Sequence, residues 1–177
     1  ARARTFGRLR RVDASFGFRI GDPAQWRLRR ALAGGGPLMD VGIYALQSAR
    51  MLTGAEPTSV SAAYAPKTDA QKFAEVEEAM TFRMEFPGGV VADCATSYSA
   101  NSNRFRATAE RGWFGLDPAY GYGGIRGERS DGAPLLPAQA GIGEVDQFAV
   151  EMDDFAQRIM TNSPTKVPGE MGRQDVR

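Results

Sequence analysis

Hydrophobic and polar residues alternate over residues 11–20 and 79–86, which is the pattern of a β-strand with one buried face. Four further stretches are predicted as strands, at residues 60–64, 90–98, 105–110 and 112–116. Turn-forming residues follow three of these six stretches, at Pro87-Gly88-Gly89, Asn101 to Asn103 and Arg111-Gly112. Strands that follow one another through short turns predict a mainly antiparallel sheet.

Two longer stretches have apolar residues at helical spacing. The first follows Gly34-Gly35-Gly36, with Pro37 at a first helical position, where the missing N–H costs nothing, and Gly54 as the C-cap. The second covers residues 144–161, and its apolar face consists of Val145, Phe148, Ala149, Met152, Phe155, Ala156 and Ile159. The sequence from Pro168 onward is typical of the approach to a last helix.

These elements predict an α+β fold, with a mainly antiparallel open sheet and two or three helices on one face. With 177 residues and 42% hydrophobic residues, we expect residues 1–177 to form one domain with a real core. Helices on one side leave the other face of the sheet open. We expect the alternating residues Phe82, Met84 and Phe86 to make that face apolar and a surface for assembly into a dimer or tetramer.

The composition excludes several kinds of site. The chain contains no histidine, which removes Ser-His-Asp triads, Cys-His dyads and histidine metal sites. Its one cysteine, Cys94, makes neither a disulfide within the chain nor a zinc site, and it lies in an apolar run typical of a buried, inert thiol. No regular alternation of oxygen ligands indicates a calcium site, so we expect no metal.

Charge and hydropathy narrow the range of partners. The formal net charge is +1, although nine arginines lie within residues 1–30. One interpretation of these arginines is a nucleic-acid-binding arm, and the other is a solvated face. Lysine and accompanying aromatic residues are scarce, which favours the solvated face. No apolar run reaches the ~18 residues of a membrane span, and no signal peptide opens the sequence. We expect a cytoplasmic protein without nucleic-acid or membrane partners, with a periplasmic location as the alternative should a leader precede this stretch.

Asp40 and Tyr44 are four residues apart near the start of the first helix and therefore share one of its faces. Asp40 falls in the first turn, where the helix dipole favours a negative charge. A carboxylate beside a phenol, next to a glycine loop, suits proton transfer. The alternative is a surface aspartate near a helix start and a tyrosine of an amphipathic core, and the spacing alone favours this alternative.

The same stretch, Gly-Gly-Gly-x-Leu-x-Asp-x-Gly-x-Tyr over residues 34–44, resembles the signature of the glucose-fructose oxidoreductase and inositol dehydrogenase family of NAD(P)-dependent sugar oxidoreductases. Many members of that family have His at the position of Tyr44, and the Tyr here resembles the glucose-fructose oxidoreductase branch. Further stretches resemble that branch in the same order: Asp22–Leu28, Ser97–Ser99, Asp117–Ala119 and Pro168–Arg177.

The resemblance implies the family's second domain, an open sheet similar to the C-terminal domain of glyceraldehyde-3-phosphate dehydrogenase. It also implies that the Rossmann domain and the Glu-Lys-Pro motif with its catalytic lysine are missing from this stretch. Residues 121–127 approach a dinucleotide fingerprint but fail it, since Arg126 stands where a last glycine belongs and no βαβ unit surrounds it. We therefore expect the substrate-binding and oligomerisation domain of an NAD(P)-dependent sugar or polyol oxidoreductase, inactive as an isolated fragment.

The resemblance also implies roles for single residues. Tyr44 is the expected acid/base during hydride transfer between a nicotinamide and a sugar carbon, and Asp40 is expected to bind and orient a sugar hydroxyl. Trp26 and Arg27 match positions near the cofactor, NAD or NADP, and Tyr122 is carried over from a loop that matches loosely.

Two of these assignments have structural alternatives. We expect Gly34 to Gly36 to let substrate or cofactor approach the backbone, with Gly36 in the substrate site, and a plain loop-to-helix junction is the alternative. For Trp26, simple packing is an equal alternative. For the chain as a whole, the alternative function is a non-catalytic sugar-binding or oligomerisation module on the same fold.

Overall fold

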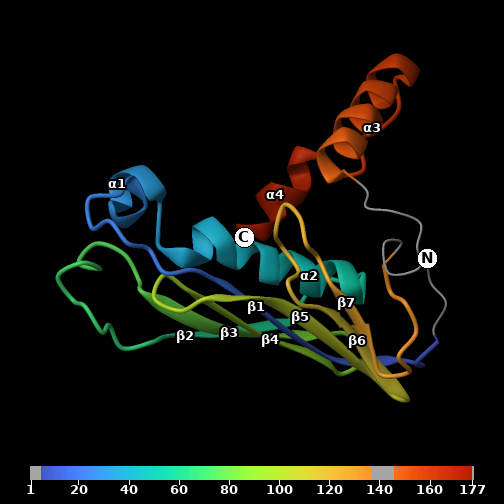
Figure 1. The fold of residues 1–177 in the computed structure, drawn as a ribbon, viewed down its shortest axis with the longest axis horizontal. Helices are drawn as coiled ribbons and strands as arrows, with labels where there is room; N and C mark the ends of the chain where they lie inside the picture. The colour runs from blue at the N-terminus through green and yellow to red at the C-terminus, as the bar shows by residue number, and fades with distance from the viewer. Residues whose placement is uncertain (1–4, 137–145, 177) are drawn as a thin grey trace. The chain divides into compact units, whose positions relative to one another are not determined.

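The computed structural model describes residues 5–136 and 146–176 of the chain. The chain divides into two compact units, Ala1–Ala133 and Pro134–Arg177. In the first unit seven strands form one sheet, in the order β2-β3-β4-β1-β5-β6-β7 (Figure 1). The strands are β1 (Leu9–Gly17), β2 (Ser59–Tyr64), β3 (Ala79–Phe86), β4 (Val90–Ser97), β5 (Ser102–Ala109), β6 (Gly112–Leu116) and β7 (Gly127–Arg129).

Neighbouring strands in the sheet are antiparallel except β1 and β4, which run parallel. This arrangement confirms the expected α+β fold with a mainly antiparallel sheet. The predicted hairpins form at Pro87–Gly89, between β3 and β4, and at Arg111–Gly112, between β5 and β6. β4 and β5 follow each other in the sequence but do not pair, because β1 lies between them, with Ala14 opposite both Cys94 and Phe105.

The segment between β1 and β2 contains the helices of the first unit: η1 (Trp26–Leu28), α1 (Arg30–Ala33), η2 (Leu38–Gly42) and α2 (Ile43–Thr53). α2 lies across one face of the sheet (Figure 1). Its Ala45 and Ala49 are fully buried, and such small side chains let the helix approach the strands closely. The core between them includes Val12, Ala14, Phe82, Met84, Ala92, Cys94 and Phe105.

The two faces of the sheet differ from the expectation. Phe82, Met84 and Phe86 are only 6%, 2% and 3% exposed, because they belong to the core on the α2 side. The prediction that they line an uncovered apolar face is therefore wrong. A strand with period-2 alternation turns its apolar residues toward the helix and its polar residues outward. Many of the outward side chains on these strands are polar or charged, and they include Asp13, Ser15, Arg83, Asp93, Arg104 and Arg106.

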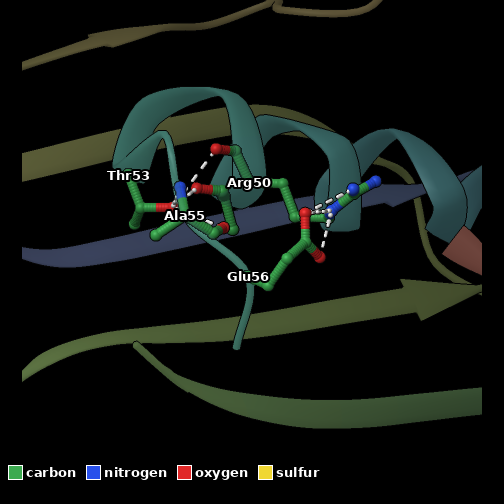
Figure 2. A network of polar contacts seen from close by, with 5 residues as sticks. Arg50, Thr53, Ala55 and Glu56 are labelled. Carbon is green, nitrogen blue, oxygen red and sulfur yellow. Dashed lines mark hydrogen bonds and ion pairs between the residues drawn. The ribbon is translucent and has the colours of Figure 1, made fainter. Parts of the chain in front are cut away.

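The end of α2 follows the predicted C-cap. Gly54 has a left-handed backbone, with φ of 64°, and its N–H donates to the carbonyl of Arg50 over 2.8 Å. The Arg50 guanidinium donates to both carboxylate oxygens of Glu56, at 2.6 and 3.0 Å (Figure 2). The Thr53 hydroxyl donates to the carbonyl of Ala49 over 2.8 Å. These contacts hold the turn that leads from α2 toward β2.

The second unit contains α3 (Gln147–Thr161) and α4 (Gly169–Asp175). Asp146 caps α3, since its Oδ1 accepts the N–H groups of Phe148 and Ala149 at 3.0 and 3.2 Å. Asn162 ends the helix in a left-handed conformation, with φ of 47°. This confirms the predicted second helix and its end, whereas residues 144–145 of the prediction lie outside the described residues.

The apolar face predicted for α3 is exposed: Met152, Phe155 and Ile159 are 70%, 57% and 67% exposed. Among the described residues, no helix combines the length and the apolar character that crossing a membrane requires. Across residues 5–136 and 146–176, no cluster of acidic or cysteine side chains forms a metal site.

Candidate functional site

The predicted start of the first helix is a π turn, η2, and not an α turn. Pro37 precedes it with φ of −62°, as expected for a proline at a helix start. The buried Thr96 of β4 donates its hydroxyl to the Pro37 carbonyl over 3.1 Å and so ties the turn to the sheet. A Cβ at Gly42 would lie 3.0 Å from Thr96 Cγ2, so a glycine lets the turn lie directly on β4. π turns inside helices are frequent at functional sites.

Asp40, in this π turn, is bonded by two donors. Arg27 Nε donates to Asp40 Oδ2 over 2.8 Å, and the Tyr98 hydroxyl donates to the same oxygen over 3.0 Å. The Asp40 side chain is 23% exposed and that of Arg27 is 33% exposed. Asp40 Oδ1 has no hydrogen-bond donor among the residues that the structure describes, so one oxygen is held by the protein and the other remains available as an acceptor.

Tyr98 follows β4 directly and is 1% exposed. Its ring belongs to a second hydrophobic cluster and meets the ring of Phe18 at 5.3 Å in an edge-on arrangement. Burial, and then the adjacent Asp40 carboxylate, raise the pKa of the Tyr98 hydroxyl above the usual value of a phenol. Tyr98 therefore stays protonated and serves as a donor. The sequence alone indicated no role for Tyr98, although Ser97–Ser99 shares the family resemblance, because its partner Asp40 is far away in the sequence.

Tyr44, in the first turn of α2, keeps 43% of its surface exposed. Its ring lies edge-on to that of Phe16 at 5.2 Å and tilted against that of Tyr120 at 5.8 Å. The Tyr44 hydroxyl makes no hydrogen bond to a described residue. Phe16, under Tyr44, and Phe18, beside Tyr98, are two residues apart in one extended segment, so they point to the same side about 7 Å apart. The surroundings of Asp40 and Tyr44 are thus adjacent.

The loop after β6 contributes Tyr120 to this aromatic group, and the cofactor contact expected of Tyr122 in the same loop stays a prediction. Tyr120 and Ser48 Oγ share a hydrogen bond of 2.9 Å, and burial raises the pKa of Tyr120 to about 12. Asn103 Oδ1 accepts the Tyr120 N–H over 2.6 Å and fixes its position. Tyr122 is 82% exposed. Tyr120 and Tyr122 alternate with glycines in one loop, and the sequence contains no signal that distinguishes one tyrosine from the other.

Trp26 and Arg27 lie in η1, beside Asp40. The Arg27 guanidinium lies 4.7 Å from the centre of the Trp26 ring, which is a cation–π distance. Trp26 is 50% exposed, so half of this large side chain is not used in packing. The structure therefore brings Arg27 and Asp40 together and leaves an exposed aromatic ring beside them.

Gly36 is in close contact with the protein's own chain. A Cβ at this position would lie 2.4 Å from the carbonyl oxygen of Glu77, which no backbone tolerates. The loop that contains Glu77 also contacts α1, because Glu75 Oε2 accepts the Arg30 N–H over 3.0 Å. The buried Glu78 accepts the N–H and the hydroxyl of Thr68, both over 2.6 Å. The glycine is required by this loop-to-helix junction, and a substrate contact at Gly36 stays a prediction.

The chain is similar to a group of sugar oxidoreductases. The profile described as GFO/IDH/MocA C-terminal domain matches residues 1–115. A D-xylose 1-dehydrogenase (NADP(+)) of Haloarcula marismortui is 30% identical over 161 residues, which cover 89% of this chain and 43% of that protein.

Solved structures agree with this match. The aldose-aldose oxidoreductase from Caulobacter crescentus, in complex with glycerol, is 42% identical with a TM-score of 0.91, over 98% of this chain and 52% of that one. Levoglucosan dehydrogenase, in complex with NADH and levoglucosan, shares the fold at 17% identity, with a TM-score of 0.73 over 97% of this chain and 55% of that one. The chain thus spans about half the length of the relatives it matches.

Proposed function

The chain belongs to the GFO/IDH/MocA family of oxidoreductases, and we propose that it is the substrate-binding and oligomerisation domain of an NAD(P)-dependent enzyme acting on sugars or polyols. The observation that carries this proposal is the Asp40 carboxylate, held by Arg27 and Tyr98 through one oxygen and four residues before the exposed Tyr44 in the same helical segment. A fixed acceptor next to a phenol suits a substrate with several hydroxyl groups. We take aldoses as the first candidates, because two relatives are named as a D-xylose 1-dehydrogenase and an aldose-aldose oxidoreductase.

Oxidation of an alcohol removes a proton from the hydroxyl and a hydride from its carbon. In our proposal Tyr44 takes the hydroxyl proton, and Asp40 Oδ1 accepts a hydrogen bond from a substrate hydroxyl and orients the sugar. A phenol, with a pKa of about 10 when free, needs nearby positive charge to act as a base near neutral pH. The family's lysine, in the other domain of the full-length enzyme, would supply part of that charge.

The residues of this chain fit the nicotinamide end of a dinucleotide and not the whole of it. Trp26 offers an exposed flat ring, and Arg27 offers a cation beside it, while Tyr122 stays a proposed further contact. No described segment forms the strand, glycine loop and helix that bind a pyrophosphate. We place that part of the site in a Rossmann domain elsewhere in the full-length protein. The nicotinamide, NAD or NADP, accepts a hydride when it is bound.

The open face of the sheet is the proposed surface for oligomerisation. Asp93 pairs there with Arg11 at 2.8 Å and with Arg83 at 3.5 Å, and Arg106 lies 4.0 Å from the centre of the Trp113 ring. Asp93, Arg106 and Trp113 are among the residues that line an open depression of about 430 Å³. A face that carries both signs of charge can pair with a copy of itself about a two-fold axis. Sedimentation of the full-length protein should show dimers or tetramers, and monomers alone would contradict this part.

The experiment that tests the proposed function uses the full-length protein. Purified enzyme should reduce NADP⁺ or NAD⁺ when aldoses or polyols are added, followed by absorbance of the reduced nicotinamide. The isolated 177-residue domain, assayed in parallel, should bind nicotinamide only weakly and show no turnover. Absence of turnover in the full-length protein, together with measurable sugar binding, would instead support a non-catalytic sugar-binding module.

A further inference from the structure

Two donors converge on a single oxygen of Asp40, and they differ in how firmly they are held. Tyr98 is 1% exposed, whereas the Arg27 side chain is 33% exposed. A tyrosine side chain has two torsions up to its ring and an arginine has four, so Tyr98 loses less conformational entropy when it holds the carboxylate. The firm donor is therefore Tyr98.

The backbone around Tyr98 is fixed on both sides. Its N–H donates to the Glu78 carbonyl over 2.9 Å, and its carbonyl accepts the Ile20 N–H over 2.9 Å. Its ring packs in the cluster of Ile20, Leu28, Phe73 and Val76. Such a side chain holds its hydroxyl at one position in space.

We infer that Tyr98 is a positioning residue for substrate binding: by donating to Asp40 Oδ2, it sets the orientation of the carboxylate and directs Oδ1 to the substrate hydroxyl. This inference rests on the proposed function and adds a residue to it. A carboxylate that is held at one oxygen has lost rotation about its terminal torsion before the substrate arrives. A substrate hydroxyl then meets an acceptor in a fixed place, which lowers the entropy cost of binding.

The two tyrosines of the site therefore have separate tasks. Tyr44 is 43% exposed and has no hydrogen bond to a described residue, as a group that exchanges protons with substrate requires. Tyr98 is buried and already bonded, and the effect of burial on its pKa keeps it protonated. It holds a proton on Oη toward Asp40 and transfers none.

The test is a double-mutant cycle in the full-length enzyme, with Tyr98→Phe, Asp40→Asn and the double variant. Tyr98→Phe keeps the ring and its packing but removes the donor. We expect kcat/KM for the aldose to fall by about 10- to 100-fold, because the lost bond is to a charged group, and chiefly through a higher KM. In the Asp40→Asn background, Tyr98→Phe should lower kcat/KM by less than about threefold, since the carboxylate to be oriented is gone.

A readout without turnover accompanies the cycle. Titration of the same aldose, followed by calorimetry, should show a weaker affinity for Tyr98→Phe that matches the rise in KM. Phe73→Leu is the control, since Phe73 lies in the same cluster, is 2% exposed and carries no polar atom. It should lower the melting temperature and leave kcat/KM within about twofold, measured well below that temperature.

The outcomes separate this inference from the proposed function. Equal losses for Tyr98→Phe in both backgrounds, or a kcat/KM within twofold of wild type, would overturn the positioning role and leave the proposed function intact. A fall in kcat/KM for Phe73→Leu as large as that for Tyr98→Phe would also overturn the positioning role, since looser packing of the whole cluster would explain both. A wild-type enzyme that neither binds nor oxidises any sugar or polyol would overturn the proposed function, and the positioning role with it.

Discussion

The two ends of α2 are built in different ways. At the C-terminal end, polar groups bond the helix and the turn that follows it. The Gly54 N–H closes the last turn, and Glu56 accepts hydrogen bonds from Arg50 (Figure 2). At the N-terminal end, the chain enters through the π turn η2, whose N-cap residue Pro37 makes no side-chain cap bond, and α2 continues directly from η2, with the Ile43 N–H donating to the Leu38 carbonyl. The carboxylate there, Asp40, bonds other side chains and not the backbone.

The difference indicates which end is shaped by function. An aspartate in a first turn interacts favourably with the helix dipole, which is typically worth about 0.3–1 kcal/mol at an exposed position. The Asp40 carboxylate has this place, but its hydrogen bonds come from the side chains of Arg27 and Tyr98, which lie far from it in the sequence. Local contacts thus close the C-terminal end, whereas distant side chains hold the carboxylate at the N-terminal end, which is the pattern expected when one end carries a site. Changes at the N-terminal end should therefore affect activity, and changes at the C-terminal end should affect stability.

The largest effect is expected for Tyr44→Phe in the full-length enzyme. The substitution keeps the ring on Phe16 and Tyr120, so the melting temperature should hardly change. If Tyr44 transfers the proton, kcat should fall by about 10²- to 10⁴-fold. Steady-state kinetics and a melting curve check both parts. Tyr64→Phe, at a 70% exposed tyrosine of the edge strand β2, is the control and should match wild type. Nearly full turnover in Tyr44→Phe would assign this residue to packing.

Asp40→Asn should have the next largest effect. It keeps the shape of the side chain but removes the charge that two donors stabilise, so we expect kcat/KM to fall by about 10- to 100-fold, with a raised KM and slower turnover. Asp131→Asn is a matched control, because Arg129, at the end of the edge strand β7, also bonds that carboxylate, at 2.5 and 2.9 Å. A normal KM in Asp40→Asn would remove Asp40 from the substrate site.

Gly36→Ala examines the glycine loop at the same end. Its Cβ would lie 2.4 Å from the Glu77 carbonyl oxygen, so the loop must shift, and we expect a loss of about 1–3 kcal/mol in the free energy of unfolding. Denaturant unfolding measures this loss. Gly21→Ala, where no atom lies within 4 Å of the added Cβ, should be close to neutral. Unchanged stability with a raised KM would instead place Gly36 against the substrate.

Glu56→Gln at the C-terminal end should have the smallest effect. The Arg50 side chain is 10% exposed, whereas that of Glu56 is 52% exposed, so one partner of the pair is largely buried. Removing the charge should cost about 1 kcal/mol of stability and leave kcat/KM unchanged. Unfolding curves and kinetics on one preparation check both. A fall in kcat/KM larger than twofold would show that the two ends are not independent.

The sequence predicted the regular parts of this fold because local chemistry determines them. Alternation placed the strands, turn residues placed the β3–β4 and β5–β6 hairpins, and Gly54 ended α2. The central place of β1 was beyond local patterns, since it depends on long-range pairing with β4 and β5. The charge of the open face was missed for a related reason: alternation shows two faces but not which one the helix covers.

The candidate site was predictable in part. Asp40 and Tyr44 came from a contiguous motif, and the structure places them in adjacent surroundings. Tyr98 and Tyr120 were missed because they reach the site from distant segments, through a hydrogen bond to Asp40 and a ring contact with Tyr44. The π turn was also missed, since helical spacing does not distinguish a π turn from the first turn of an α-helix.

The central claim is that the N-terminal end of α2 carries the substrate site and the C-terminal end does not. The most direct test is kcat/KM for aldose oxidation by the full-length enzyme, compared between Asp40→Asn and Glu56→Gln under the same conditions. The account predicts a fall of about 10- to 100-fold for Asp40→Asn and less than about twofold for Glu56→Gln. Equal values for the two variants, or a larger loss in Glu56→Gln, would contradict it.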